Sequence, residues 1–212
     1  MVLVKRVTSE KELNDVFKVR YKVYCLERGY ERPEDYPNGF ESDEYDPYSI
    51  HFIVYVNSLP IGTARLILRN PFDLPIERHC NVDIKSICAD PGKVVEISRL
   101  AVSSEVTKGC SIKKTAIMFN LIREIYHTTQ CLNIEYVVAA MGQGLERILK
   151  KCGIMFIKIG DPVEYHGIRI PYYAHIEELM GGLSQNRNDV FQFFSLPQNT
   201  TLSAGMHNVV YS

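Results

Sequence analysis

The chain has 212 residues, of which 46% are apolar, 23% charged and 10% aromatic. This composition excludes an intrinsically disordered protein, and the length fits one domain or two small ones. We predict a single domain over residues 1–212, in which 195–212 could form an extended tail. The 24 basic and 25 acidic residues give a net charge of -1, which argues against general attraction to nucleic acid or to an anionic membrane.

No segment approaches the ~20 consecutive apolar residues of a transmembrane helix, and the N-terminus lacks the apolar core of a signal peptide. We therefore predict a cytoplasmic protein. The six cysteines contain no CxxC pair, which favours reduced, structural thiols. The scattered histidines and cysteines lack a second pair of ligands, so we predict no metal site.

The N-terminal region predicts a strand over residues 2–7 followed by a helix. Ser9 and Glu12 have the spacing of a capping box, in which the serine accepts an N–H of the first turn and the glutamate reaches back. Arg20 occupies a vacant position on the apolar stripe that ends at Tyr24. We therefore expect an arginine that faces the core.

Residues 27–48 form a long acidic segment with interleaved aromatic residues, which is typical of an ordered functional loop. Two β-rich runs, 50–56 and 61–68, follow as a predicted hairpin, and 70–92 is expected to be irregular. Residues 94–102 are apolar on both faces and hence predict a central strand, although this strand contains Glu96 and Arg99.

A Ser/Gly turn over 103–111 leads from that strand into a predicted helix over 112–126. A strand that ends in such a turn offers N–H groups and the positive end of a helix dipole to a phosphate. Four residues add local positive charge or flexibility there: Lys108, Gly109, Lys113 and Lys114. The remaining chain predicts strands 134–140, 154–159 and 168–175, a helix over 145–152 and short helices up to 194, which together describe an α/β domain with a mixed sheet.

Four segments occur in the order and spacing of a known pattern: Arg20 followed by Tyr24, then 41–46, 62–66 and 96–100. This pattern resembles acyl-homoserine-lactone synthases and their relatives, the long-chain N-acyl amino acid synthases and the exosortase-associated acyltransferases. Residues 164–172 are similar to the last two groups. The resemblance implies the GNAT N-acyltransferase fold, a central mixed twisted sheet flanked by helices.

The resemblance also implies an acyl-carrier-protein thioester as donor, with its phosphopantetheine arm beside the central strand and no tightly bound cofactor. Carrier proteins are acidic, so basic residues at the turn suit them. The glycine-rich pyrophosphate loop of coenzyme-A-using GNAT enzymes is only partly present, which favours a carrier protein over coenzyme A. The expected donor contacts are Ser103, Lys108, Gly109, Lys113 and Lys114.

In this interpretation Glu96 is the general base that takes the proton of the attacking amine, directly or through water. With the ordinary pKa values of a glutamate and an α-amine, proton transfer from the amine to the glutamate is unfavourable by roughly 5 kcal/mol. Burial of the carboxyl group would reduce this free-energy difference. Backbone N–H groups of the central strand would hold the thioester oxygen, and direct attack needs no covalent cysteine. The residues expected to bind substrate or order the site are Arg20, Tyr24, Asp43, Asp46, Arg65, Ser98, Arg99, Leu100 and Val102.

A structural alternative exists for several of these residues. The arginines and aspartates could form a buried salt-bridge network that holds the acidic loop on the sheet, a role compatible with shaping the amine site. Arg99 could pair with an acid of the loop. His166 and Arg169 could contact the carboxylate of an amine substrate, or could belong to an exposed hairpin.

Lactone synthases use S-adenosylmethionine, and members of that branch usually carry tryptophan in the N-terminal segment, whereas this chain has none. We therefore favour N-acylation of an amino acid or a similar small amine by a long-chain acyl group. A lactone synthase, or a non-catalytic module that binds an acyl-carrier protein or an acylated metabolite, are the alternatives.

Overall fold

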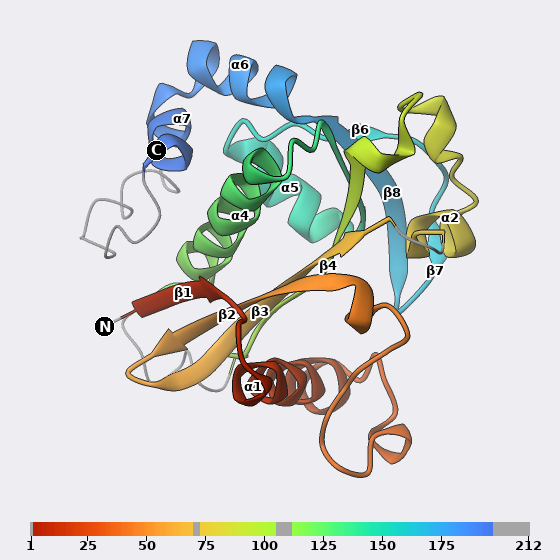
Figure 1. Cartoon of the computed structure of the whole chain (residues 1–212), viewed down its shortest axis with the longest axis vertical. Helices are drawn as coiled ribbons and strands as arrows, with labels where there is room; N and C mark the ends of the chain where they lie inside the picture. The colour runs from red at the N-terminus through yellow and green to blue at the C-terminus, as the bar shows by residue number, and fades with distance from the viewer. Residues whose placement is uncertain (1, 70–72, 105–111, 197–212) are drawn as a thin grey trace. The chain divides into compact units, whose positions relative to one another are not determined.

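A computed structural model of the protein describes residues 2–69, 73–104 and 112–196. Hydrogen bonding orders the strands β1-β2-β3-β4-β5-β8-β6, and β7 pairs with β8. The strands are β1 (Val2–Arg6), β2 (Ser49–Val56), β3 (Leu59–Leu68), β4 (Val94–Val102), β5 (Tyr136–Met141), β6 (Ile157–Lys158), β7 (Val163–Glu164) and β8 (Ile168–His175). The α-helices are α1 (Glu10–Tyr21), α2 (Pro75–Cys80), α4 (Lys114–Cys131), α5 (Gln143–Lys151), α6 (Ile176–Asn186) and α7 (Asn188–Ser195) (Figure 1).

The chain divides into two compact units. Of the described residues, the first unit contains 2–66, 99–104 and 112–127, and the second contains 67–69, 73–98 and 128–196. The strands β3 and β4 and the helix α4 each pass from one unit into the other. The single domain over 1–212 stays a prediction, and the expected tail lies outside the described residues beyond Leu196.

In the first unit, β1 runs antiparallel to β2, with Val2 opposite Val56 and Arg6 opposite Phe52. The predicted hairpin of β2 and β3 is present. Its turn is tighter than expected, because Asn57 and Ser58 alone connect the strands, with φ angles of 49° and 68°. Two central residues with positive φ give a turn whose twist matches that of the strands it joins.

The start of α1 follows the predicted cap with one difference. The Oγ of Ser9 accepts a hydrogen bond from the Glu12 N–H at 3.3 Å, as expected. The Glu12 carboxylate reaches back to the Thr8 N–H at 2.9 Å instead of to Ser9 itself, and also accepts from Lys5 of β1 at 2.6 Å. These bonds lower the pKa of Glu12 to about 2. The glutamate therefore both caps α1 and ties it to β1.

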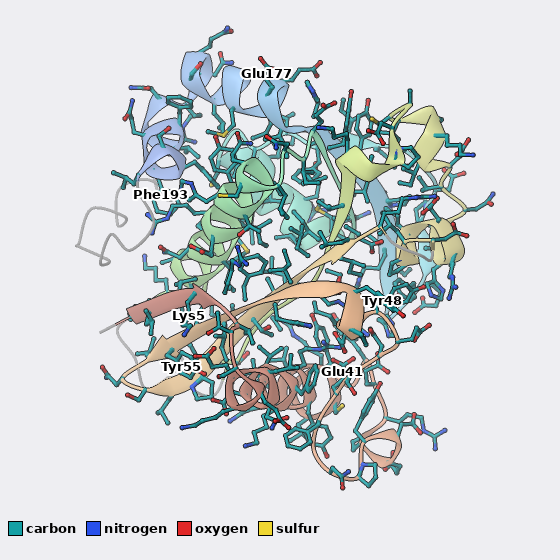
Figure 2. All side chains as sticks on the ribbon, viewed as in Figure 1. Lys5, Glu41, Tyr48, Tyr55, Glu177 and Phe193 are labelled. Atoms are coloured by element: carbon teal, nitrogen blue, oxygen red, sulfur yellow. The ribbon has the colours of Figure 1, made fainter. Side chains whose placement is uncertain are left out.

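The helix α1 covers one face of the sheet in the first unit, and the part of α4 in this unit lies on the other face (Figure 1). Val16 and Val19 of α1 are buried. The hydroxyl of Tyr55, which Figure 2 labels on β2, donates to Asp15 of α1 at 3.0 Å. On β3, a Cβ at Gly62 would lie 3.3 Å from Ile117 of α4. Glycine at this position thus permits close packing of strand and helix.

The last turns of the first helical segment are π-helical, over η1 (Lys22–Glu27). A π-helix changes the directions in which successive side chains project and is frequent at functional sites. It bears Tyr24, which packs on the cluster of Val19, Val23 and Ala101, and it ends at Glu27.

In the second unit, β4 begins parallel to β5, and β5 runs antiparallel to β8 from Tyr136 opposite His175 to Met141 opposite Ile170. The expectation that 70–92 is irregular is wrong at α2. Pro75 occupies the first turn of this helix, where its fixed φ and missing N–H cost nothing, so proline begins the helix here instead of breaking it.

The predicted strand over 154–159 is also wrong in extent, because only Ile157–Lys158 pairs, opposite Tyr173 and Tyr172. The buried Ile154 instead donates its N–H to the Leu149 carbonyl at the end of α5. The helix needs partners for its last carbonyl groups, and this requirement overrides the strand propensity of an apolar residue.

Candidate active site

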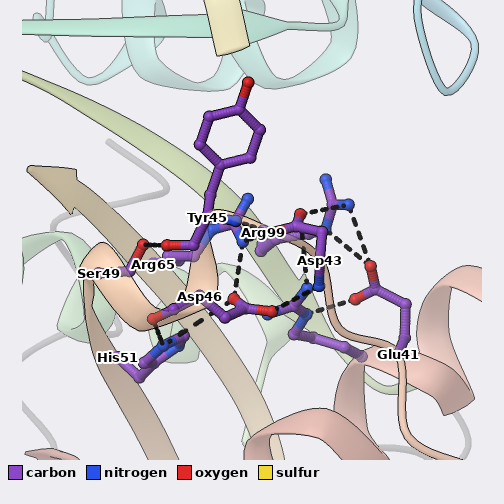
Figure 3. Close-up of polar contacts among 9 residues, drawn as sticks. Glu41, Asp43, Tyr45, Asp46, Ser49, His51, Arg65 and Arg99 are labelled. Carbon is purple, nitrogen blue, oxygen red and sulfur yellow. Dashed lines mark hydrogen bonds and ion pairs between the residues drawn. The ribbon is translucent and has the colours of Figure 1, made fainter. Parts of the chain in front are cut away.

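A network of three arginines and three acids forms the polar centre of the first unit (Figure 3). Its members come from α1, the loop after η1, β3 and β4: Arg20, Glu41, Asp43, Asp46, Arg65 and Arg99. The side chains of Arg20 and Glu41 are fully buried, and Arg65 is 1% exposed. Charges in such a place require partners, and the equal number of positive and negative groups provides them.

Two of the arginines share one aspartate. Arg20 donates to Glu41 through Nε and to Asp46 Oδ1 through Nη1, the latter at 2.6 Å. Arg65 donates through Nη1 to the same Asp46 oxygen at 2.7 Å and also to Asp43. The predicted network that holds the acidic loop on the sheet is thus present.

Arg99 joins the network from β4. It donates through Nε to Glu41 at 3.1 Å, and its Nη2 lies 3.0 Å from both Glu41 and Asp43. Its guanidinium carbon lies 5.5 Å from the centre of the Tyr24 ring, a cation–π arrangement. The φ of Arg99 is +50°, a conformation that non-glycine residues seldom adopt within a strand. The ion pairs hold a local distortion of β4 in place at this residue.

The network also determines the ionisation of its members. Burial by itself would raise the pKa of Asp43, but the hydrogen bond from Arg65 and the charges of the three arginines outweigh it and lower that pKa to about 2. The pKa values of Glu41 and Asp46 are lowered by the same balance. Burial lowers the pKa of His51, whose Nε2 lies 3.1 Å from the Asp46 carbonyl oxygen. All three acids are therefore ionised at neutral pH.

At the end of β4, the Glu27 carboxylate meets the turn where we expected donor contacts. The Ser103 hydroxyl donates to it at 2.7 Å, and the Ser104 N–H lies 3.0 and 2.8 Å from its two oxygens. Lys114, the first residue of α4, donates to the Ser104 hydroxyl, and Lys113 precedes it on the surface. Lys108 and Gly109 lie outside the described residues.

The second unit contains the proposed base. Glu96 of β4 is 2% exposed, and one carboxylate oxygen accepts the Ile76 N–H of α2 at 2.9 Å. The same helix carries Cys80, which is 6% exposed. Burial, with the charge of Glu96 as a second cause, raises the pKa of Cys80 to about 11. The charge of Glu96 thus contributes to keeping the buried Cys80 thiol protonated.

Beyond Glu96, the surroundings of β4 change. Its described register with β5 extends from Val94 to Glu96, and the following residues Ile97 to Leu100 are half-buried instead of buried. Ser98, Leu100 and Val102, which we expected to bind substrate or to order the site, all follow the end of this pairing.

The remaining predicted residues lie on the hairpin of β7 and β8, also in the second unit. Its turn consists of Tyr165, His166 and Gly167, of which the last two have positive φ. The Tyr165 ring stacks on His79 of α2, with centroids 4.2 Å apart, and lies 4.3 Å from the His166 ring. Arg169 is half-buried on β8 and donates to the Ile168 carbonyl. The hairpin is thus ordered by stacking, which the sequence prediction did not anticipate.

Four participants were missed from the sequence: Glu41, Glu27, the Ile76 amide and the stack of His79 on Tyr165. Glu41 had a signal, since it begins the acidic motif of 41–46. The other three contacts join residues far apart in the chain, and a sequence pattern does not encode them. Among the described residues, no three His, Cys, Asp or Glu side chains gather as metal ligands would, and the absence of a metal stays a prediction.

Comparison with known proteins identifies the family of this chain. The model of the family described as N-acyl amino acid synthase FeeM matches residues 15–175. The chain belongs to this family. The predicted resemblance and the N-acyltransferase class are thereby confirmed. A shorter match is with an acetyltransferase-like protein of Bacillus subtilis (strain 168), which is 35% identical to this chain over 66 residues. The match covers 30% of this chain and 41% of that protein, which is less than half of the relative's length.

Solved structures confirm the predicted fold class. FeeM, an N-acyl amino acid synthase from uncultured soil microbes, superposes with a TM-score of 0.65 at 15% identity over 87% of this chain and 96% of that protein. BjaI, a CoA-dependent acyl-homoserine lactone synthase solved with SAM and isopentyl-CoA, gives 0.69 at 14% identity over 99% of both chains. The acyl-homoserine lactone synthase LasI gives 0.63 at 16% identity over 86% and 95%. These likenesses concern the fold.

In the described segments, no helix combines the length and the hydrophobicity that a membrane crossing requires.

Proposed function

We propose that this member of the FeeM family transfers a long-chain acyl group from an acyl-carrier-protein thioester to the α-amine of an amino acid or a similar small amine. The amine nitrogen forms a bond to the thioester carbonyl carbon, the carbon–sulfur bond breaks, and the carrier leaves as its thiol. The amine must give up one proton in this exchange. The family supports an acyl donor and an amine acceptor.

The burial of Glu96 carries the proposal. A carboxylate that is 2% exposed on a strand is costly unless it is used or paired, and the Ile76 N–H at 2.9 Å orients one oxygen. We propose that this carboxylate accepts the proton of the amine, directly or through water.

Cys80 bears on whether the acyl group first moves to the protein. Its pKa of about 11 keeps the thiol protonated at neutral pH, and the thiolate is the form that attacks a thioester. A protonated thiol is a poor nucleophile. We therefore infer direct attack by the amine, without an acyl-enzyme intermediate.

The backbone of β4 beyond Glu96 supplies the second element of the mechanism. Backbone N–H groups of the segment 98–102 would hold the thioester oxygen while negative charge develops on it. The positive φ of Arg99 redirects the peptide groups on either side of this residue, and the ion pairs of Arg99 hold that geometry. In this proposal the arginine network orders the oxygen-binding segment and does not itself react.

The remaining residues are assigned to substrates. His166 and Arg169 on the β7–β8 hairpin are proposed to contact the carboxylate of an amine substrate, with the Tyr165 stack on His79 fixing the turn. Ser103, Lys113 and Lys114 are proposed to face the phosphopantetheine arm and the acidic carrier protein. The cytoplasmic location stays a prediction.

The test is a product screen by mass spectrometry. The purified protein is mixed with C8 to C16 acyl-carrier protein, the twenty amino acids and S-adenosylmethionine, while the released carrier thiol is measured. We expect an N-acyl amino acid. Binding of the carrier without thiol release would contradict the proposed reaction and support a binding module.

Two variants test the mechanism within that assay. Glu96→Gln keeps an oxygen for the Ile76 N–H but cannot take a proton, so kcat should fall by about 10²–10⁴-fold while donor affinity stays unchanged. Cys80→Ser should retain kcat near that of the wild type. An unchanged kcat in Glu96→Gln, or a complete loss in folded Cys80→Ser, would refute the assignment.

A lactone synthase is the second candidate, favoured by the superposition with BjaI over 99% of both chains. In the same screen, an acyl-homoserine lactone formed together with methylthioadenosine would identify it.

A further inference from the structure

A second glutamate of the second unit holds the start of α2. Glu77 is the third residue of this helix, and its Oε2 atom accepts the Leu74 N–H at 2.8 Å. Arg69, which directly follows β3, donates to the same oxygen through Nη1, and its Nη2 lies 3.6 Å from Asp73. The side chains of Glu77 and Arg69 are only 13% and 20% exposed. This pair is therefore part of the packed structure and is little screened by solvent.

The cap of Glu77 and the proposed base meet in one helical turn. The N–H groups at a helix start lack partners within the helix and need acceptors elsewhere. Pro75 has no N–H, and the Ile76 N–H is donated to Glu96 at 2.9 Å. The Leu74 N–H is donated to Glu77. Two carboxylates thus accept N–H groups two positions apart, and the turn that Glu77 caps is the turn that orients Glu96.

The helix α2 depends on such contacts for its shape. It has six residues, and helices this short are unstable alone, because the first turn fixes many dihedral angles for few hydrogen bonds. Leu74 and Ile76 are 1% and 0% exposed, but apolar burial has no preferred direction, whereas a hydrogen bond has one. At the other end of α2, His79 stacks on Tyr165. The direction of the Ile76 N–H is therefore set mainly by the cap at the helix start.

We propose that Glu77 is a positioning residue for the reaction: it fixes the first turn of α2, whose Ile76 N–H orients the carboxylate of Glu96. This inference rests on the proposed function, in which Glu96 takes the proton of the amine. A displacement of about 1 Å at a reacting group can cost up to about 10²-fold in rate. Arg69 offsets the second negative charge at this helix start, so that two carboxylates can share it.

Three variants separate positioning from stability. Glu77→Ala removes the cap and its ion pair, whereas Glu77→Gln keeps an oxygen that can accept the Leu74 N–H. Glu12→Ala is the matched control in the first unit. Glu12 is also the third residue of its helix, accepts the Thr8 N–H at 2.9 Å and pairs with Lys5 of the preceding strand. Thermal melts verify that the variants fold, and both alanine variants should have a lower Tm.

The first measurement is amide hydrogen exchange by NMR, which requires no turnover. The Ile76 amide reports the helix start, and the amide of Val138, which is 0% exposed on β5 between β4 and β8, reports wider opening. In Glu77→Ala we expect the Ile76 amide to exchange about tenfold faster relative to Val138, the effect of a lost helix cap. Glu77→Gln should stay within about threefold of the wild type, and Glu12→Ala within about twofold.

The second measurement is the acyl-transfer rate. Glu77→Ala should lower kcat about tenfold and change KM for donor and amine by less than about twofold, since it affects proton transfer and not binding. Glu77→Gln should recover most of this loss, and Glu12→Ala should keep the wild-type kcat. Adding Glu77→Ala to Glu96→Gln should change kcat by less than about twofold, because the group that it positions is already lost. A merely structural loss would lower kcat equally in both backgrounds.

Unchanged Ile76 exchange in Glu77→Ala, or an equal acceleration in Glu12→Ala, would overturn the proposal. So would a tenfold loss of kcat that persists in the Glu96→Gln background. A failed product screen would remove the proposed acyl transfer, and the exchange rates would still show whether Glu77 holds the Ile76 amide. Product formation together with unchanged exchange would retain the transfer and remove the positioning role, so the two failures are distinguishable.

Discussion

Arg20 should be the residue on which the stability of the first unit depends most. Its side chain is fully buried and bonds to Glu41, which is also fully buried, and to Asp46, which is 6% exposed. Arg20→Met keeps the apolar stem of the side chain and leaves both acids short of positive charge. Loss of one partner from a buried ion network costs about 3–5 kcal/mol, which lowers Tm by roughly 6–20 °C for a chain of this size.

The measurement is urea unfolding followed by far-UV circular dichroism, supported by thermal melts. Exposed Arg32 offers a control of the same type, and Arg32→Met should change the free energy of unfolding by less than about 0.5 kcal/mol. Adding Glu41→Gln to Arg20→Met should recover part of the loss, because it removes one uncompensated charge. Two results would refute the account of the network as mutual charge compensation. One is a loss of less than about 1 kcal/mol in the free energy of unfolding of Arg20→Met, and the other is a further decrease of that free energy when Glu41→Gln is added.

Two further predictions concern stability. The folded-state pKa values of Asp43 and Glu12, both about 2, lie below their ordinary values of 3.8 and 4.5, so their stabilisation is complete at neutral pH and is lost as pH falls from about 4.5 toward 2. For Asp43 this amounts to about 2 kcal/mol, and urea unfolding at each pH should show a shallower acid loss in Asp43→Asn; an identical slope would contradict the assignment. Gly62→Ala should cost about 1–3 kcal/mol, because its Cβ would lie 3.3 Å from the Ala101 carbonyl oxygen and from Ile117. Gly144→Ala, which meets no atom within 4 Å and lies in the first turn of α5, is its control and should be neutral or stabilising in the same melts, so an equal loss of Tm in both variants would exclude close packing as the reason.

Much of the local structure was predictable from the sequence. The central strand has the predicted bounds Val94–Val102, and β8 has the predicted bounds Ile168–His175. The burial of Arg20 followed from its place on an apolar stripe of α1. In each case the signal is a periodicity of side chains along one element, and this periodicity survives folding because each element presents one face to the core.

The errors occurred where a second contact outweighed the local preference. Pro75 begins α2 instead of belonging to an irregular segment, and Ile154 caps α5 instead of joining β6. Each of these residues has more than one structure open to it locally. Which structure is adopted depends on partners elsewhere, so the sequence pattern was ambiguous at these positions.

The residue types of the candidate site were determined by the sequence, since the buried acids and arginines and the glutamate of the central strand all stand in recognisable patterns. The tertiary structure alone decided which atoms meet. Glu27 bonds to Ser103 and Ser104, and the Ile76 amide bonds to Glu96, although 76 and 20 positions separate these pairs. Contacts of this kind arise when elements pack and bring distant groups within hydrogen-bonding range. Their specificity lies in three-dimensional position, and no linear spacing in the chain encodes it.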